Sequence, residues 1–254
     1  MKPVAIVTGA SSGIGMAIAK RLGASGHHVV LVARRADALA TLASSMASAE
    51  VLAADLASEE GVAAVAARIE RGADVVINCA GFGQAGVFAD LDIARESDVL
   101  QVNVVAVVQL THAALRAMRP SRRGVVVNVA SLAAFQPCPY LATYGATKAF
   151  LTSFGCALDH EMKGTGVRVV TLCPGYTRSG FQEANGVPAD HLPSMAWQTV
   201  DEVAETTMAA IGAPRAIVIP GWMNWLSSLV VGFVPTWMAA AVSARTVGIP
   251  KSAN

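Results

Sequence analysis

The chain reads Thr8-Gly9-Ala10-Ser11-Ser12-Gly13-Ile14-Gly15 directly after the apolar run Val4–Val7. The glycines at 9, 13 and 15 permit a tight turn and let a ligand approach the backbone. A helix is expected from Met16 to about Leu22, and its N-terminus would present free N–H groups and a partial positive charge. The stretch therefore predicts a dinucleotide pyrophosphate site at Gly9, Ser11, Ser12, Gly13, Ile14 and Gly15. A glycine-rich turn without a ligand is the alternative.

Short apolar runs alternate with longer Ala-rich stretches along the rest of the chain. The predicted strands are Val4–Thr8, His28–Val32, Val51–Ala53, Val75–Asn78, Val125–Val129, Val167–Leu172 and Ile217–Ile219. Such Val-rich runs are typical of a parallel sheet covered on both faces, and right-handed crossovers make that sheet doubly wound. We expect an α/β, Rossmann-like fold with seven parallel strands and helices on both faces, in a single dinucleotide-binding catalytic domain over residues 1–254.

Composition narrows the class of protein. Hydrophobic residues make up 54% of the 254 residues and charged residues 15%, which favours a large core over disorder. The net charge of +1 and the lack of a Lys/Arg stripe exclude a nucleic-acid binding surface.

The cysteines, histidines and N-terminus indicate a cytoplasmic enzyme without a metal. The cysteines at 79, 138, 156 and 173 form no CxxC pair, which is typical of reduced, packed thiols. The five histidines lack metal-ligand spacing. Lys2 and Pro3 lead straight into a strand, so we expect neither a signal peptide nor a metal site.

The residues after the second predicted strand indicate which dinucleotide is bound. An NAD enzyme places an acid there to accept hydrogen bonds from the ribose hydroxyls. Here Ala33 is followed by Arg34 and Arg35, whose guanidinium groups suit the 2′-phosphate of NADP. We expect NADPH to be preferred over NADH, the alternative being that both arginines are solvated charges at a helix start.

Tyr144 and Lys148 are four residues apart, which places the phenol and the ammonium on one helical face. A nearby cation favours the phenolate, so Lys148 is expected to lower the pKa of Tyr144 and to make it a general acid and base. Ser131 follows the strand Val125–Val129 at the carboxyl edge of the sheet, where ligands bind. These three side chains predict reduction of a carbonyl or oxidation of an alcohol.

In these motifs the chain resembles the short-chain dehydrogenase/reductase family, and within it a bacterial branch similar to ketoacyl and carbonyl reductases. The family pattern TGxxxGxG is matched by Thr8–Gly15, the acid after the third strand by Asp55-Leu56, and NNAG by Asn78-Cys79-Ala80-Gly81. The catalytic tetrad is matched by Asn103, Ser131, Tyr144 and Lys148. The PG motif is matched by Pro174-Gly175-Tyr176-Thr177-Arg178-Ser179.

The resemblance implies a role for each of these positions. Asp55 and Leu56 would border the adenine, and Asn78, Ala80 and Gly81 the adenosine and ribose. Tyr144 and Lys148 would also contact the cofactor, Lys148 at the nicotinamide ribose. Asn103 would interrupt a helix and hold a water that relays protons to Lys148. Pro174, Gly175, Thr177 and Ser179 would lie at the nicotinamide.

Several positions depart from the family pattern. Cys79 replaces an Asn and removes no catalytic group, while Ser179 replaces Thr and keeps the hydroxyl. Gly145 stands where Ser is usual and costs the helix up to ~1 kcal/mol. Cys138 lines the substrate cleft or is a structural thiol, and the sequence leaves both open.

The substrate is expected to be a small hydrophobic carbonyl or alcohol. A variable lid at about 181–198 contains Phe181, Val187, Leu192, Met195 and Trp197 among few charges. The alternative to an enzyme is a non-catalytic NADP-sensing protein on the same fold, but the complete tetrad favours the enzyme.

The long helices around Asn103 and Tyr144 predict a homodimer or homotetramer, as the family commonly pairs these helices. Apolar surface there is expected from Val105, Val108, Leu110, Leu151 and Phe154.

An apolar C-terminal helical segment at about 221–249 is too interrupted to span a bilayer. Its helix is expected to end near Val234, before Pro235. Its apolar face is formed by Trp222, Trp225, Leu226, Leu229, Val230 and Phe233. We expect this face to close the substrate pocket or a subunit contact. Peripheral membrane contact is the alternative, disfavoured because no Lys or Arg lines the polar face.

Overall fold

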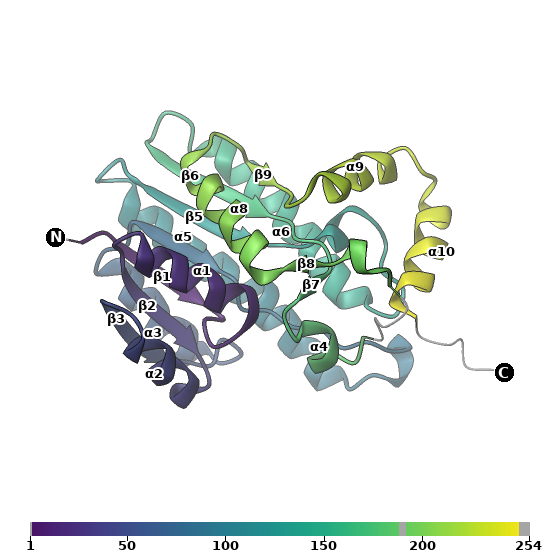
Figure 1. Cartoon of the computed structure of the whole chain (residues 1–254), viewed down its shortest axis with the longest axis horizontal. Coiled ribbons are helices and arrows are strands. Elements are labelled where there is room, and N and C mark those ends of the chain that lie inside the picture. The colour runs from purple at the N-terminus through teal and green to yellow at the C-terminus, as the bar shows by residue number, and fades with distance from the viewer. Residues whose placement is uncertain (1, 188–191, 249–254) are drawn as a thin grey trace.

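The computed structural model describes residues 2–187 and 192–248. Its centre is a parallel sheet in the strand order β3-β2-β1-β4-β5-β6-β9 (Figure 1), which confirms the predicted α/β fold with seven parallel strands. The strands are β1 (Val4–Thr8), β2 (His28–Ala33), β3 (Ala49–Ala53), β4 (Val75–Asn78), β5 (Gly124–Val129), β6 (Val167–Leu172) and β9 (Ile217–Val218). Four of them differ by one or two residues from the predicted bounds.

Helices cover both faces of the sheet. One face carries α1 (Gly13–Ala24), α2 (Ala36–Ser44) and α8 (Val200–Gly212), and the other carries α3 (Glu59–Glu70), α5 (Ala106–Met118) and α6 (Ala142–Glu161). Successive residues of β1 show why the strands are apolar throughout. Ala5 and Val7 belong to the core on the first face and Ile6 to the core on the second. A strand buried on both sides cannot alternate with polar residues.

The strand order places the ligand-binding edge. β1 pairs with β2 on one side and with β4 on the other. From β1 the chain continues to β2, and from the adjacent β4 it continues to β5, on the opposite side in the strand order. A crevice opens at the carboxyl ends of the strands at such a point, and ligands of open α/β sheets bind there.

The helical stretch Ile93–Met118 is formed by α4 (Ile93–Leu100), a π-helical turn (Gln101–Val105) and α5. Among the described residues it alone is long and apolar enough to cross a membrane, with a mean hydropathy of 1.3. However, 56% of the 18-residue stretch that has this hydropathy is buried inside the protein, as in the core helix of an α/β domain.

The predicted lid contains little regular structure. It comprises α7 (Phe181–Ala184), a 3₁₀ turn (Ser194–Ala196) and β8 (Gln198–Thr199), which pairs with β7 (Thr177–Arg178). Positions 188–191 of the lid lie outside the described residues. Two further 3₁₀ turns, Phe88–Asp90 and Leu132–Phe135, follow β4 and β5.

The C-terminal segment forms two helices, α9 (Trp222–Val231) and α10 (Thr236–Val247), at one end of the molecule (Figure 1). The expected helix end near Val234 is wrong by three residues, because Gly232 caps α9 and Pro235 starts the next helix. Position 249 lies outside the described residues. The division of the chain into domains stays a prediction.

Candidate active site

The glycine-rich turn joins β1 to α1 at the carboxyl edge of the sheet. Gly9 and Gly13 have φ of 69° and 54°, in the left-handed region that favours glycine. A Cβ on Gly9 would lie 2.9 Å from the Ala80 nitrogen, and one on Gly15 would collide with the Gly9 carbonyl oxygen. The turn therefore packs so closely that only glycine fits at these two positions.

The N-terminus of α1 opens into a cavity. The Ser12 side chain caps none of its N–H groups. These groups face a cavity of about 1260 Å³, which is lined by Gly9, Ser11, Ser12, Gly13, Ile14 and Gly15 among others. This volume exceeds the ~300–1,000 Å³ of a typical small-molecule site, so it has room for a dinucleotide together with a substrate.

Arg34 and Arg35 line the same cavity beside Asp55 and Leu56. The Arg35 guanidinium donates from Nη2 to the Ser11 hydroxyl at 3.0 Å, and so reaches back over the glycine-rich turn. Both arginines are exposed, and the residue before them is the uncharged Ala33. This corner of the cavity is therefore built for an anion.

Thr8 fastens the end of β1 to the end of β4. Its hydroxyl accepts hydrogen bonds from the nitrogens of Cys79 and Ala80 at 3.0 and 3.1 Å. Ala80 and Gly81 line the cavity, whereas Asn78 does not. Asn78 is buried and donates to Asn128 Oδ1 at 2.8 Å, so this side chain ties β4 to β5.

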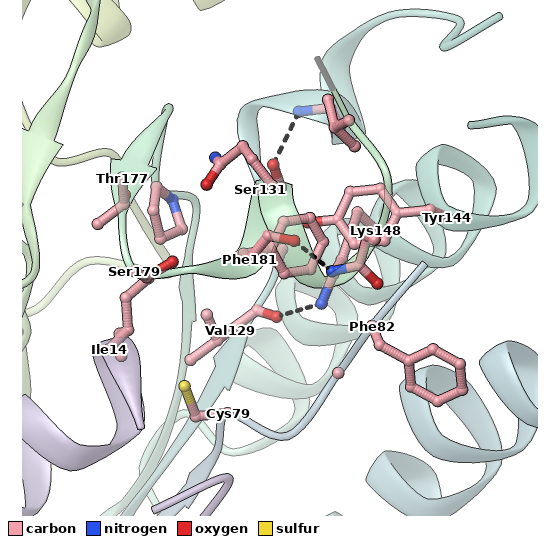
Figure 2. A pocket seen from close by; sticks show the side chains of 18 of the residues that line it. Ile14, Cys79, Phe82, Val129, Ser131, Tyr144, Lys148, Thr177, Ser179 and Phe181 are labelled. Atoms are coloured by element: carbon pink, nitrogen blue, oxygen red, sulfur yellow. Dashed lines mark hydrogen bonds between the residues drawn. The ribbon is translucent and has the colours of Figure 1, made fainter. Parts of the chain in front are cut away.

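Ser131, Tyr144 and Lys148 converge on one wall of the cavity (Figure 2). Tyr144 lies in the first turn of α6, with its hydroxyl close enough to Ser131 for that side chain to lower its pKa. Lys148 is one turn further, with its Nζ 5.5 Å from the Tyr144 ring centroid and donating to the Val129 carbonyl at 2.9 Å. The side chains thus come from α6 and from the end of β5.

Asn103 lies in the π-helical turn between α4 and α5, so the expected helix interruption is present. Its side chain is buried, accepts from the Phe82 nitrogen at 3.1 Å and donates to the Phe82 carbonyl at 2.9 Å. A Cβ on Gly81 would lie 3.0 Å from Asn103 Oδ1 and 3.3 Å from Lys148 Nζ. Asn103 therefore lies behind the cavity wall, close to the ammonium.

The ionisation of Tyr144 differs from the expectation. Burial raises the pKa of Tyr144 above its ordinary value, and the hydrogen bond from Ser131 opposes this only in part. Burial also lowers the pKa of Lys148 to about 8. The expectation that Lys148 holds the pKa of Tyr144 low is wrong for the protein without cofactor, because both groups are desolvated. Tyr144 is consequently protonated at neutral pH.

The other end of the cavity is largely apolar. The Phe181 ring of the lid lies 5.2 Å from the Tyr144 ring, and Leu141, Val187 and Met195 also line this end. Cys138 lines it as well, which decides the alternative that the sequence left open. Leu192 and Trp197 of the predicted lid do not line it.

The sequence did not single out three further residues that line the cavity. Asn185 in the lid is buried, accepts from the Gly83 nitrogen at 2.7 Å and donates to the Phe181 carbonyl at 2.6 Å. Asn224 of α9 and Ser243 of α10 line the cavity from the C-terminal segment. No local pattern marks Asn185 and Asn224 as lining residues, since each also binds a partner distant in sequence, Gly83 and Gln198 respectively.

Pro174, Gly175, Thr177 and Ser179 line the cavity after β6, as the resemblance implied. A Cβ on Gly175 would lie 2.6 Å from Asn224 Nδ2, so this glycine allows α9 to approach. Within residues 2–187 and 192–248, no group of three or more His, Cys, Asp or Glu side chains is arranged to hold a metal ion.

Comparison with known proteins matches this geometry to a family. The sequence profile of the short chain dehydrogenases matches residues 3–187. A curated relative, the monensin polyketide synthase putative ketoacyl reductase of Streptomyces virginiae, is 40% identical over 185 residues, covering 69% of this chain and 71% of the relative.

Two solved structures share the fold over most of both chains. A short-chain dehydrogenase from Sphingobium yanoikuyae in complex with NADPH has a TM-score of 0.81 and 29% identity, covering 91% of this chain and 94% of the other. A bulky-bulky ketone specific alcohol dehydrogenase from Comamonas testosteroni has a TM-score of 0.78 and 28% identity, covering 91% and 93%.

Proposed function

This chain belongs to the short-chain dehydrogenase/reductase family, and from that membership we propose that it is an NADP(H)-dependent enzyme that interconverts a carbonyl and a secondary alcohol of a hydrophobic small molecule. The observation that carries the proposal is the arrangement of Ser131, Tyr144 and Lys148 on one wall of the cavity that also contains the free N-terminus of α1. The three side chains supply the proton chemistry, and the helix N-terminus supplies an anion site for the pyrophosphate of the dinucleotide. Carbonyl reduction by a nicotinamide dinucleotide needs both.

The residues present fit a dinucleotide. Gly9 and Gly15 allow the tight turn between β1 and α1, and the helix behind it has uncapped N–H groups for a pyrophosphate. All four of Asp55, Leu56, Thr177 and Ser179 line the cavity, where the first two would border the adenine and the last two the nicotinamide. When bound, the nicotinamide supplies the hydride.

A preference for NADPH is part of the proposal. Arg34 and Arg35 line the cavity where the ribose of the adenosine would lie, and the position directly after β2 holds Arg34 and no acid that could accept hydrogen bonds from the ribose hydroxyls. Guanidinium groups bind phosphate through paired, charge-assisted hydrogen bonds. The Arg35 bond to Ser11 holds that side chain over the turn already.

Tyr144 is the proton donor for carbonyl reduction. Its raised pKa keeps the phenol protonated at neutral pH, and Ser131 is in hydrogen-bond contact with its hydroxyl. A substrate oxygen that meets both hydroxyls receives a hydrogen bond and then the proton of Tyr144. Lys148, with Asn103 behind it, is the cation close to this proton.

A hydrophobic substrate is supported by the apolar end of the cavity. Phe181, Leu141 and Val187 line it next to Tyr144, so an apolar group attached to the carbonyl carbon would be enclosed there. The named ketone specificity of the Comamonas relative belongs to that protein, but it agrees with a cavity of this volume.

We further propose a cytoplasmic homodimer or homotetramer. Unpaired thiols at all four cysteines support a reducing compartment. The expected apolar surface on α5 and α6 is wrong in two positions, because Leu110 and Leu151 are buried in the core. Val105, in the π-helical turn before α5, and Phe150, on α6, are exposed and retain an apolar surface for a partner.

The test of the proposed reaction is NADPH oxidation with a panel of aliphatic, aromatic and cyclic ketones and diketones, followed at the absorbance of the reduced nicotinamide. Turnover of at least one bulky ketone that stops in the Tyr144→Phe variant supports the proposal. Tight NADPH binding without turnover of any ketone, and without oxidation of the matching alcohols by NADP⁺, favours instead a non-catalytic NADP-sensing protein on this fold.

A further inference from the structure

An unusually apolar surface lies on the outside of α9 and α10. We call it the C-terminal apolar face, and it consists of Trp222, Trp225, Leu226, Leu229, Val230, Phe233, Trp237 and Met238. Trp222 and Trp237 are each 73% exposed and Phe233 is 89% exposed. Figure 1 shows α9 and α10 at the end of the molecule, beyond the sheet and its covering helices. We expected this face to close the substrate pocket or a subunit contact, and the first of these is wrong, because none of its residues lines the cavity.

The opposite side of α9 closes the pocket instead. Met223, Asn224, Ser227, Ser228 and Val231 line the cavity. The Asn224 amide donates to the Gln198 side chain and to the Pro220 carbonyl, both at 2.9 Å, which fixes the helix in this orientation. The polar residues of α9 therefore line the cavity, with Asn224 and Ser228 partly buried and Ser227 exposed.

This orientation removes the sequence-based objection to a membrane. An interfacial helix usually carries Lys or Arg because its polar side faces water. In α9 the polar side lines the substrate cavity and does not belong to the outer surface, so the lack of Lys and Arg there does not count against a lipid contact through the other side. The outer side has the composition of an interfacial contact, since it contains three of the four tryptophans of the chain.

Charge favours a lipid surface over a second copy of the chain. After Glu205 the sequence contains no acidic residue and three basic ones, Arg215, Arg245 and Lys251. In a two-fold contact the same segment meets itself, and a segment with bases and no acids brings no opposite charge of its own to pair with. An anionic membrane surface attracts such a segment.

We propose that the C-terminal apolar face seats this protein on the surface of a lipid bilayer, as a peripheral contact that does not span it. α9 then separates the bilayer from the substrate cavity, with its tryptophans in the headgroup region and Asn224 and Ser227 in the cavity. The binding depends on this face alone and not on the proposed reaction.

The test is flotation of the purified full chain with vesicles of equimolar phosphatidylcholine and phosphatidylglycerol. The variant Trp222→Ser/Trp225→Ser/Phe233→Ser removes three side chains of the face, none of which lines the cavity. The matched control Val51→Ser/Phe88→Ser/Ile93→Ser removes three exposed apolar side chains elsewhere.

The wild type and the control should float with the vesicles, and the partition coefficient of the first variant should fall by at least about a hundredfold, because three large apolar side chains leave the lipid. NADPH oxidation with a water-soluble ketone and the thermal melting curve should be unchanged in that variant. The proposal is overturned if the wild type does not float, or if both variants float equally. It is also overturned if the first variant only lowers the oligomeric state, which would assign the face to a second copy.

Discussion

The hydroxyl of Tyr144 is subject to two opposing influences. Burial against the lid and the β5 edge raises its pKa, and the hydrogen bond with Ser131 lowers it. The first influence is the larger, so the phenol stays protonated throughout the neutral range. For carbonyl reduction this is the useful state, since the group must hold a proton until a substrate oxygen meets it.

Replacing Tyr144 by Phe should therefore lower turnover by at least ~10²-fold, the usual loss when a general acid is removed. NADPH affinity should change little, because the ring remains in place. Tyr140, which does not line the cavity, provides the matched control, and Tyr140→Phe should keep near-normal turnover. Steady-state rates and NADPH fluorescence titration measure both effects. Near-normal turnover in Tyr144→Phe would exclude this residue as the acid.

The two arginines after β2 should determine cofactor preference. Arg34→Ala should weaken NADPH binding about ten- to a hundredfold, because a charged hydrogen bond contributes ~1.5–3 kcal/mol. NADH binding should be unchanged, as it has no 2′-phosphate. Arg35→Ala should also weaken NADPH binding, and it additionally removes the bond to Ser11. Titration of both cofactors checks this, and equal wild-type affinities would contradict it.

The lowered pKa of Lys148 has a consequence for stability without cofactor. Its pKa is about 8 in the folded chain and 10.5 in the unfolded chain, so between these values the unfolded state binds more protons. Stability due to this group therefore rises with pH from about 8 to 10.5, by up to ~3 kcal/mol. Below pH 8 the folded protein carries a buried, desolvated ammonium.

The comparison that isolates this effect is urea unfolding of the wild type and Lys148→Met between pH 7 and 10. The wild type should gain stability relative to the variant as pH rises. The titratable groups that act on Lys148 are the thiols of Cys79 and Cys173, whose pKa values of about 11 and 12 keep them neutral over most of this range. A constant difference across the range would show that Lys148 is not desolvated.

At the scale of elements, the lid is fastened by one side chain. The Asn185 amide bridges the Gly83 nitrogen and the Phe181 carbonyl, and the Asn185 carbonyl accepts from the Ala85 nitrogen at 3.1 Å. These bonds join α7 to the loop after β4, which passes close to Tyr144. Asn185 is a positioning residue for the Phe181 ring.

Asn185→Ala should loosen α7 by removing both side-chain bonds, which are worth about 1–3 kcal/mol when their partners stay buried. We expect KM for the carbonyl substrate to rise several-fold, with kcat and NADPH affinity changing less. Hydrogen exchange of α7 should become faster. Asn185→Asp keeps the acceptor for Gly83 and loses the donor to Phe181, so it should show an intermediate effect. Unchanged exchange in both variants would refute the role.

The elements differ in how well the sequence predicts them. The strands and Ser131, Tyr144 and Lys148 follow from local patterns, namely apolar runs, strand ends and one helical turn. The contacts of Asn185 and Asn224 do not, because the partner of the first is 102 residues away. Gly145 reads as a weak point of a helix, yet in the structure a Cβ there would lie 2.8 Å from the Cys138 Cβ. Only tertiary packing gives that reason.

At the scale of the whole molecule, two regions of exposed apolar side chains bear on what the protein contacts. One is the C-terminal apolar face. The other lies on α5 and α6, where the Phe150 and Phe154 rings stack with centroids 5.5 Å apart. Val105 is also exposed, two residues after the buried Asn103. The first was predicted as a helix stripe and the second as an assembly surface. The sequence alone did not distinguish the inner and outer sides of these helices. Helical periodicity predicts that a helix has an apolar face, but not what packs against that face.

The α5 and α6 surface should hold the protomers together. Light scattering at micromolar concentration should give a dimer or tetramer, and Phe150→Asp should lower the mass, because a carboxylate would be buried without a partner in a contact across a two-fold axis. Phe88→Asp, at another exposed aromatic residue, is the control and should leave the mass unchanged. A monomeric wild type would contradict the assembly. If the oligomer persists in Phe150→Asp, the protomers contact each other through another surface. The Trp222→Ser/Trp225→Ser/Phe233→Ser variant would then show whether that surface is the C-terminal apolar face.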